Sequence, residues 1–220
     1  MLGRLKSMWR DTCLNPCPLA RTIKYNFLRS NSIRRSINSF LMLTSYSVLD
    51  IHCTAKLEIK GITTFGFKKY RGSRVETSLW MDRNSSLNVD SLSVYHGCDI
   101  QIFKGAKVEI ARDCVMNRGA QIICQEEVTI GVGCLISRGV VIRDNDGGHS
   151  ILTEGYKKSA PVHIGNHVWI GQNAIIMKGV TIGDGAIIGA GAFVCTNVKP
   201  KALIMADPSR MFVKDVEWTA

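Results

Sequence analysis

The feature that most constrains the fold of this chain is a six-residue repeat between Ile164 and Lys199. The stretch divides without remainder into six hexapeptides, which read IGNHVW, IGQNAI, IMKGVT, IGDGAI, IGAGAF and VCTNVK. Each opens with an aliphatic residue and carries a small apolar residue four places later. A helix repeats about every 3.6 residues and an ordinary strand every two, so a period of six indicates a chain that turns a corner every sixth residue. This pattern is typical of a parallel β-helix, an all-β fold.

A second level of repetition extends this interpretation towards the N-terminus. The segments VEIARDCVMNRGAQI, residues 108–122, and VTIGVGCLISRGVVI, residues 128–142, match with an offset of twenty residues. One coil of three hexapeptides plus a two-residue corner extension gives this offset. Further upstream, residues 47–59 alternate apolar and polar side chains and predict the strand that enters the first coil. We therefore expect the β-helix domain to occupy residues 47–200.

Composition favours a single cytoplasmic domain with an appendage. The 220 residues with 45% hydrophobic content suffice for one sizeable core. The sequence has no run of about 18 apolar residues, so a transmembrane helix is not expected. Arg4, Lys6 and Arg10 interrupt the apolar stretch that a signal peptide needs. Among the eight cysteines, Cys114 and Cys134 fall at inward positions of the repeat, where reduced thiols pack like small apolar residues. We expect a reducing compartment, the cytoplasm.

The first 46 residues form a basic appendage that we expect to be helical. Residues 1–35 hold eight lysines and arginines against one aspartate, and apolar residues interleave with these charges. The apolar side of such a helix either packs on the β-helix or makes a peripheral contact with an anionic membrane, here its inner face. No recognition motif for nucleic acid accompanies the charge, so a nucleic-acid partner is not expected.

The chain leaves the repeat at Pro200, and residues 201–220 are mixed and polar. The end of a β-helix exposes an open coil that needs a cover. We expect this segment to be a C-terminal cap, with Met211, Phe212, Val213 and Trp218 over the last coil.

The six-residue rule fails once inside the predicted domain, over residues 143–163, which read RDNDGGHSILTEGYKKSAPVH. Loops expelled from a rigid solenoid are where function concentrates. This loop places Asp144, Asp146 and His149 within six positions of one another, around the pair Gly147 and Gly148. A lone loop histidine is usually only solvated, but the insertion and its neighbouring acids favour a functional interpretation of His149.

The stretch HIGNHVWIGQNAIIMKGVTIGDGAIIGAGAFV resembles the hexapeptide-repeat acyltransferases, in particular the maltose/galactoside O-acetyltransferases and the sugar O-acetyltransferases of capsular-polysaccharide and colanic-acid type. The resemblance covers roughly residues 108–213. It implies a left-handed β-helix assembled as a homotrimer, with active sites in the clefts between subunits. It also implies acetyl-CoA as co-substrate, a sugar or glycan acceptor, and no metal.

The resemblance assigns roles to the loop and to two residues of the coils. His149 matches the family's general base, although the family loop usually reads Asp-x-Asp-Gly-His and this one has one more glycine. Asp144 or Asp146 would hold the imidazole or bind sugar hydroxyls. Asn117 matches an asparagine of the acceptor site and Trp169 a tryptophan beside the CoA and acceptor pocket; alternatively, Asn117 satisfies a corner and Trp169 covers a coil edge.

For CoA, the resemblance places pantetheine near Gln172 and Ala190 and the nucleotide near Cys195 and Thr196. The family often has Thr-Lys where this chain has Cys195-Thr196. The lysine is therefore missing, and Arg210, Lys199 or Lys201 would supply charge for the phosphates.

The predicted function is acetyl-CoA-dependent transfer of an acetyl group to a sugar hydroxyl, directly within a ternary complex. One alternative on the same fold is a γ-carbonic-anhydrase-like metalloenzyme, for which His149, His163 and His167 are the nearby candidate ligands. The other is a non-catalytic β-helix scaffold or binding module.

Overall fold

The computed structural model describes residues 19–27, 32–68, 73–147 and 154–206, and these form one helix and three long parallel sheets. Sheet A contains β1 (Ile33–Arg35), β4 (Lys56–Ile59), β7 (Ser86–Val89), β10 (Lys107–Ile110), β13 (Glu127–Ile130), β16 (Val162–Ile164) and β19 (Thr181–Ile182). Sheet B contains β2 (Phe40–Leu43), β5 (Ile62–Phe67), β8 (Leu92–Tyr95), β11 (Cys114–Met116), β14 (Leu135–Ile136), β17 (Trp169–Ile170), β20 (Ile187–Ile188) and β22 (Leu203–Ile204). Sheet C contains β3 (Ser47–Ile51), β6 (Thr77–Met81), β9 (Asp99–Ile102), β12 (Gln121–Cys124), β15 (Val141–Arg143), β18 (Ile175–Ile176) and β21 (Phe193–Val194).

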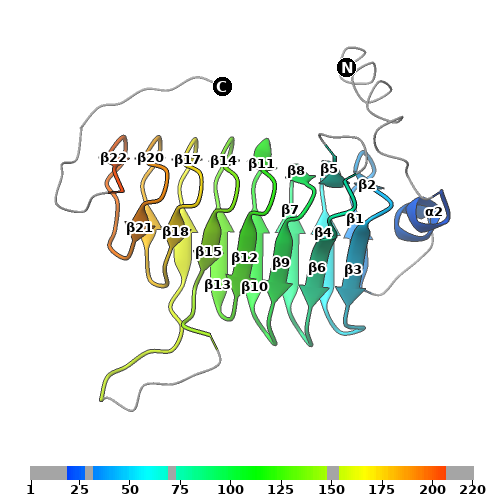
Figure 1. Ribbon diagram of the computed structural model, residues 1–220. Coiled ribbons are helices and arrows are strands. Elements are labelled where there is room, and N and C mark those ends of the chain that lie inside the picture. The colour runs from blue at the N-terminus through cyan, green and yellow to red at the C-terminus, as the bar shows by residue number, and fades with distance from the viewer. Residues whose placement is uncertain (1–18, 28–31, 69–72, 148–153, 207–220) are drawn as a thin grey trace.

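The chain visits sheets A, B and C in turn, so each circuit forms one coil of a prism and adds one strand to each sheet (Figure 1). This confirms the predicted parallel β-helix. The twenty-residue offset is also confirmed, because Val108 pairs with Val128. In the hexapeptide region the offset falls to eighteen residues, with Ile164 paired to Ile182.

The core is a column of aliphatic side chains that run from coil to coil inside the prism. The opening residues of the hexapeptides are fully buried, as at Ile170, Ile176 and Ile182, and so are the small residues at Ala174 and Ala186. No coil encloses this column by itself, so each is stabilised by the coils above and below it. The result is a rigid wall on which corner residues are spaced at about 4.8 Å, the distance between neighbouring strands.

The β-helix begins earlier than the sequence predicts. Ile33 pairs with Leu57 and Phe40 pairs with Ile62, so the first coil starts at residue 33 rather than at 47. Within residues 1–46, the helical prediction therefore holds for α2 (Leu19–Phe27) and fails for residues 33–43, which are strands of the first coil. Residues 1–18 lie outside the described residues.

Helix α2 packs on the first coil at the β2 edge (Figure 1). The amide of Asn26 donates to the carbonyl of Leu41 at 2.7 Å and accepts from the N–H of Leu41 at 2.8 Å, as a neighbouring strand would. The Arg21 guanidinium donates to the carbonyl of Ser47 at 2.8 Å. β2 is the edge strand of sheet B, and the hydrogen bonds of Asn26 pair part of its otherwise exposed backbone with helix α2. Across the described residues, no helix has the length and apolar character needed to cross a membrane.

At the other end, β22 pairs with β20 and extends the β-helix to Ile204. The predicted cap therefore begins as a further rung of sheet B. Met211, Phe212, Val213 and Trp218, which we expect to cover the last coil, lie outside the described residues.

Candidate functional site

The predicted loop leaves the β-helix between β15 and β16, at the corner between sheets C and A, and projects from the side of the prism (Figure 1). Its two ends run antiparallel and form a short stem. Asn145 bridges Ser159, the Asp146 N–H donates to the Lys158 carbonyl at 3.1 Å, and the Ala160 N–H donates to the Asp144 carbonyl at 2.9 Å. The insertion is thus closed at its neck. His149 lies outside the described residues.

Asp144 anchors the base of this stem to the coil below. Its side chain is completely buried, and its carboxylate accepts hydrogen bonds of 2.7 Å from the backbone N–H groups of both Gln125 and Glu126. The Cys124 thiol lies 3.3 Å from the same carboxylate. Gln125 and Glu126 follow β12 at the corner that separates it from β13, so they are the two extra residues of the twenty-residue coil. With both oxygens engaged inside the fold, Asp144 has no oxygen facing a sugar or an imidazole, and its contacts favour a structural role.

Asn145, which the sequence interpretation passed over, completes the anchor. It is fully buried, and its amide donates to the Ile123 carbonyl and to the Asp144 carboxylate, both at 2.9 Å. Its side-chain oxygen accepts from the Gly147 N–H at 3.0 Å. The only sequence signal for this role is its place between two aspartates at the first residues of the insertion.

Asp146 stands on the outer part of the stem and is held by Lys178 and Tyr156. The Tyr156 hydroxyl donates to Asp146 Oδ2 at 2.5 Å, and the Lys178 ammonium pairs with the same oxygen. The Lys178 ammonium also donates to the Lys157 carbonyl at 2.5 Å and lies 4.4 Å from the centre of the Tyr156 ring. These contacts lower the pKa of Asp146, mainly through the hydrogen bond from Lys178, and raise the pKa of Lys178.

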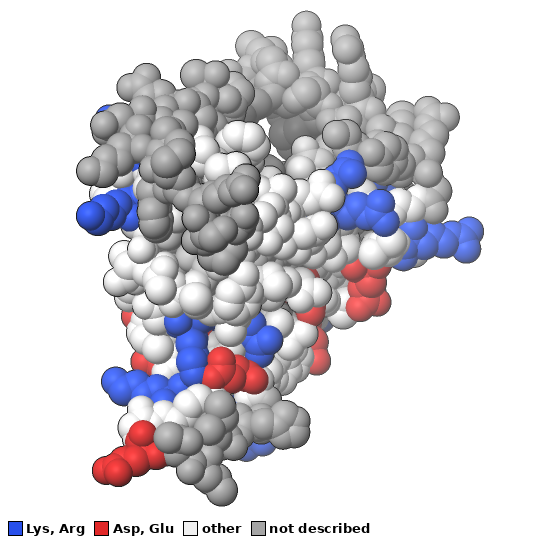
Figure 2. Space-filling view, turned by 60° about the vertical axis from the view of Figure 1, so that its left-hand side comes forward, with Lys and Arg blue, Asp and Glu red and all other residues white. Residues whose placement is uncertain are grey.

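Charged side chains of both signs lie around this stem. On the face in Figure 2, acidic and basic side chains lie next to one another at the lower end of the molecule, and further charged side chains lie along its right-hand side and at its upper left. Sequence reasoning missed Lys178 and Tyr156. The available signal is that Lys178 is the single cation among the third positions of the six hexapeptides.

Asn117, Gln172 and Ala190 lie on a different edge, the corner between sheets B and C. Asn117 caps its own corner, because its side-chain oxygen accepts from the Arg118 N–H at 2.9 Å. Gln172 and Ala190 are exposed on consecutive coils, and the Gly191 N–H donates to the Gln172 carbonyl at 2.7 Å. The methyl side chain of Ala190 projects little from this corner, so it leaves space beside the side chain of Gln172.

The same edge carries positive charge on its N-terminal coils. Arg118 and Arg138 are exposed on consecutive coils, joined by a hydrogen bond of 3.1 Å from the Gly139 N–H to the Arg118 carbonyl. Buried beside them, His96 has its pKa lowered by desolvation and further by Arg118, Lys68 and Arg138. Three cations, Arg118, Lys68 and Arg138, therefore lie near enough to the buried His96 to act on its charge.

Trp169 projects from sheet B, where it pairs with Leu135 and Ile187, and is 42% exposed. Its indole N–H donates to the Ser137 hydroxyl at 3.2 Å. Cys195 and Thr196 are both exposed at the corner between sheets C and A, one coil beyond Lys178. Arg210 lies outside the described residues.

The described site residues therefore do not converge within one chain. Asn117, Gln172 and Ala190 line the B–C corner, Asp146, Cys195 and Thr196 lie at the C–A corner, and Trp169 stands on sheet B. A straight prism keeps its corners apart over its whole length.

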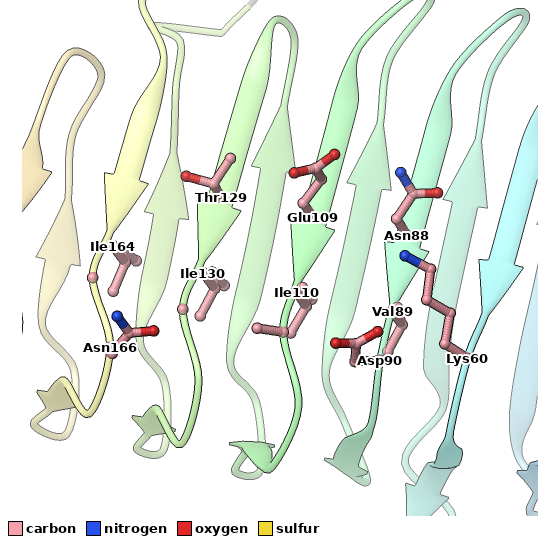
Figure 3. A pocket seen from close by; sticks show the side chains of 13 residues that line it. Lys60, Asn88, Val89, Asp90, Glu109, Ile110, Thr129, Ile130, Ile164 and Asn166 are labelled. Carbon is pink, nitrogen blue, oxygen red and sulfur yellow. The ribbon is translucent and has the colours of Figure 1, made fainter. Parts of the chain in front are cut away.

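A groove along the described residues lies elsewhere. Its volume is about 370 Å³, and it runs over sheet A and the corner between sheets A and B, from Lys60 to Asn166. In Figure 3 the polar side chains of Asn88, Glu109 and Thr129 stand in a row across consecutive strands of sheet A. None of the predicted site residues lines this groove.

A metal centre has no support among the described residues, because no three His, Cys, Asp or Glu side chains there gather as a ligand set. His163 points outward from sheet A and its Nδ1 lies 2.9 Å from the Thr129 hydroxyl. His167 occupies the corner between sheets A and B with a positive φ of 54°.

Comparison with known proteins agrees with this architecture. The model of the bacterial transferase hexapeptide family, six repeats, matches residues 161–196. The galactoside O-acetyltransferase of Escherichia coli K12 is 35% identical over 109 residues, which are 49% of this chain and 54% of the relative. The chloramphenicol acetyltransferase of Agrobacterium fabrum is 47% identical over 60 residues, 27% of this chain and 29% of the relative. The chain thus spans about half or less of the length of these relatives.

Solved structures agree over a longer stretch. The polySia-specific acetyltransferase NeuO superposes with a TM-score of 0.52 at 23% identity, covering 86% of this chain and 88% of that one. AntD, an N-acyltransferase from Bacillus cereus, superposes with a TM-score of 0.53 at 14% identity, covering 89% and 87%. Residues 161–196 are thus a bacterial transferase hexapeptide repeat, and the chain is a left-handed β-helix with sequence relatives among the acetyltransferases.

Proposed function

We propose that this protein is an acetyl-CoA-dependent O-acetyltransferase that acts on a hydroxyl of a sugar or polysaccharide precursor, with His149 as general base. The observation that carries the proposal is the anchored loop. It interrupts the hexapeptide β-helix, and the buried Asp144 and Asn145 fix its base five and four residues before His149. The sequence likeness to galactoside O-acetyltransferase supports the reaction class.

The chemistry requires a base because a sugar hydroxyl is almost fully protonated at neutral pH. In the proposed reaction, neutral His149 accepts the hydroxyl proton while the oxygen attacks the thioester carbonyl of acetyl-CoA. A backbone N–H or an ordered water stabilises the tetrahedral oxyanion. The intermediate then expels the CoA thiolate, which takes the proton from the imidazolium, so the transfer is direct and leaves no acyl group on the enzyme.

The CoA would lie along the C-terminal coils, against the exposed residues Gln172 and Ala190 and, for its nucleotide, near Cys195 and Thr196. AntD, which shares the fold, has been solved with coenzyme A bound. Lys199 and Lys201 are exposed one corner beyond Thr196 and are available for the phosphates in place of the missing lysine. Arg210 remains a further candidate for the same role.

We also propose a homotrimer as the active form. The separation of the site residues onto different edges of the prism supports this proposal, because a neighbouring subunit can face its B–C corner, with Asn117, towards the loop of the first. Trp169 would then border the same cleft. Size-exclusion chromatography with light scattering tests the assembly, and a monomer with full activity would refute it.

An acidic acceptor is favoured by the cations on the B–C corner. Arg118 follows Asn117 directly, and Arg138 lies one coil further on. Guanidinium groups bind carboxylates through paired hydrogen bonds. We therefore expect Arg118→Ala to raise the KM for carboxylated oligosaccharides several-fold while leaving that for neutral ones unchanged, in a panel that contains both.

The direct test of the proposed function is acetyl transfer in the same acceptor panel with the wild type and with His149→Ala. Loss of about 10²–10⁴-fold in kcat is expected for a missing general base, with CoA binding retained in calorimetry. Equal rates for the two proteins, or no binding of CoA to the wild type, would overturn the proposal.

A location at the inner face of the membrane, and a peripheral contact there, are further proposals that α2 supports. Ile23 and Phe27 are 42% and 72% exposed one helical turn apart, beside the exposed cations Arg21 and Lys24. Such a surface suits the interface of an anionic bilayer. Cosedimentation with vesicles containing an anionic lipid should fall in Phe27→Ser, and no cosedimentation of the wild type at low salt would remove the proposal.

A further inference from the structure

We propose that Lys178 is a positioning residue for the loop that carries His149: its ammonium crosses the neck of the loop and fixes the direction of the stem. This inference rests on the proposed function for its catalytic consequence. The clamp formed by Lys178, Asp146 and Tyr156, which we call the stem clamp, is defined by contacts of the described residues alone.

The three contacts of Lys178 come from both sides of the stem. Asp146 belongs to the strand that leaves the β-helix, whereas the Lys157 carbonyl and the Tyr156 ring belong to the strand that returns. The Tyr156 hydroxyl closes the triangle by donating to Asp146 at 2.5 Å. One cation thus ties the two halves of the loop to each other as well as to the coil that follows.

Lys178 has a rigid base from which to do this. It lies on the corner between β18 and β19, next to Met177, whose N–H donates to the Val194 carbonyl at 2.9 Å. The following Gly179 N–H donates to the Ala160 carbonyl at 3.0 Å, at the foot of the returning strand. The coil therefore touches the stem at its foot through the backbone and at its outer part through the Lys178 side chain.

The environment separates this ion pair from an ordinary surface pair. Isolated exposed pairs contribute little, because solvent screens them and both side chains lose freedom. Here the side chains of Lys178 and Asp146 are only 22% and 27% exposed, and the ammonium has three partners. The pKa of Asp146 is lowered by Lys178 first and Tyr156 second, and by Arg143 to a lesser extent.

Two sets of contacts hold the stem at different points along its length. Asp144 and Asn145 fix its base to the preceding coil, whereas the stem clamp fixes its outer part to the following coil. Asp146 precedes His149 by only three residues. Loss of the clamp alone should therefore leave the fold and the foot of the stem intact but displace the general base, His149. A displacement of about 1 Å can lower the rate about 100-fold.

The test compares Lys178→Met, Lys178→Arg and Lys157→Met. Methionine keeps the length of the side chain and removes the charge, arginine restores the charge, and Lys157→Met removes one charge from the same loop without touching a clamp side chain. The readouts are kcat and the KM for acetyl-CoA, the pH dependence of kcat, the Tm, and hydrogen exchange of the Asp146 amide, which donates across the stem.

Lys178→Met should lower kcat about 10- to 100-fold, change the KM for acetyl-CoA less than about two-fold, leave the Tm nearly unchanged and speed exchange at Asp146. The pH dependence of kcat should keep its shape, because His149 is still the general base and only its position changes. Lys178→Arg should recover most of kcat, and Lys157→Met should match the wild type. Wild-type kcat and exchange in Lys178→Met, or equal losses in Lys157→Met, would overturn the proposal.

Failure of the proposed function gives a different result. If the wild type transfers no acetyl group to any acceptor and binds no CoA, the reaction is wrong, and exchange at Asp146 still decides whether Lys178 holds the stem. If the wild type is active and Lys178→Met is equally active, the clamp has no catalytic role.

Discussion

The carboxylate of Asp144 accepts a hydrogen bond of 2.7 Å from the backbone N–H of Glu126, which belongs to the coil below. The same carboxylate accepts from the Gln125 N–H, so one buried side chain satisfies both donors of the two-residue corner extension. A corner that departs from the hexapeptide rule is thus stabilised by a residue of the insertion one coil later.

This pairing predicts that Asp144→Ala destabilises the fold. Two buried donors lose their partners, at about 1–3 kcal/mol each, and the Tm should fall by roughly 5–15 °C in thermal unfolding. Asp144→Asn should lose less, because its amide oxygen still accepts one of the two bonds. Asp50→Ala, at an exposed position of sheet C, is the control. An unchanged Tm in Asp144→Ala would contradict the structural role.

Cysteine reactivity offers a test of the CoA assignment. Burial raises the pKa of the Cys98 thiol to about 12 and raises that of Cys124 still further, which leaves little thiolate at pH 8. Cys195 and Cys53 are exposed. Iodoacetamide at pH 8, followed by peptide mass spectrometry, should modify Cys53 and Cys195 and spare Cys98.

Saturating CoA should then slow the modification of Cys195 and leave Cys53 unaffected. Cys53 lies at the opposite end of the β-helix, beside β3, and serves as an internal control. Equal labelling of Cys195 with and without CoA would show that the nucleotide does not lie against this corner.

Much of the fold is predictable from the sequence because the β-helix repeats its packing. Each opening aliphatic from Ile164 onward meets the same environment, and the structure buries these residues as the period predicts. The first coils escape this reasoning because their offsets are irregular. Ile33 pairs with Leu57 at an offset of 24 residues and Phe40 with Ile62 at 22, so no period marks them.

The candidate site is less predictable because its contacts join positions unrelated by the repeat. The loop and its aspartates stand out as an interruption, but a spacing cannot tell that Asp144 turns inward to Gln125 while Asp146 turns outward. Lys178 meets Asp146 across 32 residues of sequence, from a corner that turns at a residue of positive φ, as do the corners before and after it. Only the course of the loop brings them together.

The stem clamp should respond to acid. The contacts of Lys178 and Tyr156 depress the pKa of Asp146 in the folded protein, so their contribution is fully present above the ordinary pKa of an aspartate, about 4. It is lost as the pH falls through the lower folded value. Exchange of the Asp146 amide, corrected for its intrinsic rate, should therefore accelerate below about pH 4.

Asp146→Asn should remove this dependence, because an amide does not titrate in this range. At every pH, the Asp146→Asn variant should exchange this amide as fast as the wild type does in acid, after correction for the intrinsic rate. If the wild type and Asp146→Asn respond to acid alike, the change in the stem has another origin.

Gly171, which precedes the proposed CoA contact Gln172, is expected to tolerate no side chain. A Cβ at this position would lie 2.6 Å from the backbone nitrogen of Ala190 and 2.7 Å from the carbonyl oxygen of Ile188, and backbone atoms cannot move aside as a side chain end can. Gly171→Ala should therefore destabilise the protein by about 3 kcal/mol. At Gly105 nothing lies within 4 Å, so Gly105→Ala meets only its positive φ of 75° and should cost about 1 kcal/mol. Urea unfolding of both variants checks the order, and a larger loss at Gly105 would contradict it.

Asn26 should hold helix α2 on the first coil, because its buried amide donates to and accepts from Leu41 in the manner of a strand. In Asn26→Ala, the N–H and carbonyl of Leu41 lose this partner, at about 1–3 kcal/mol. The helix should then separate from β2 more often, so trypsin should cleave after Arg21 and Lys24 faster than in the wild type. Lys24→Ala removes one cleavage site at an exposed position and should leave cleavage after Arg21 unchanged. If cleavage after Arg21 is equally slow in Asn26→Ala, the helix is retained by contacts other than this amide.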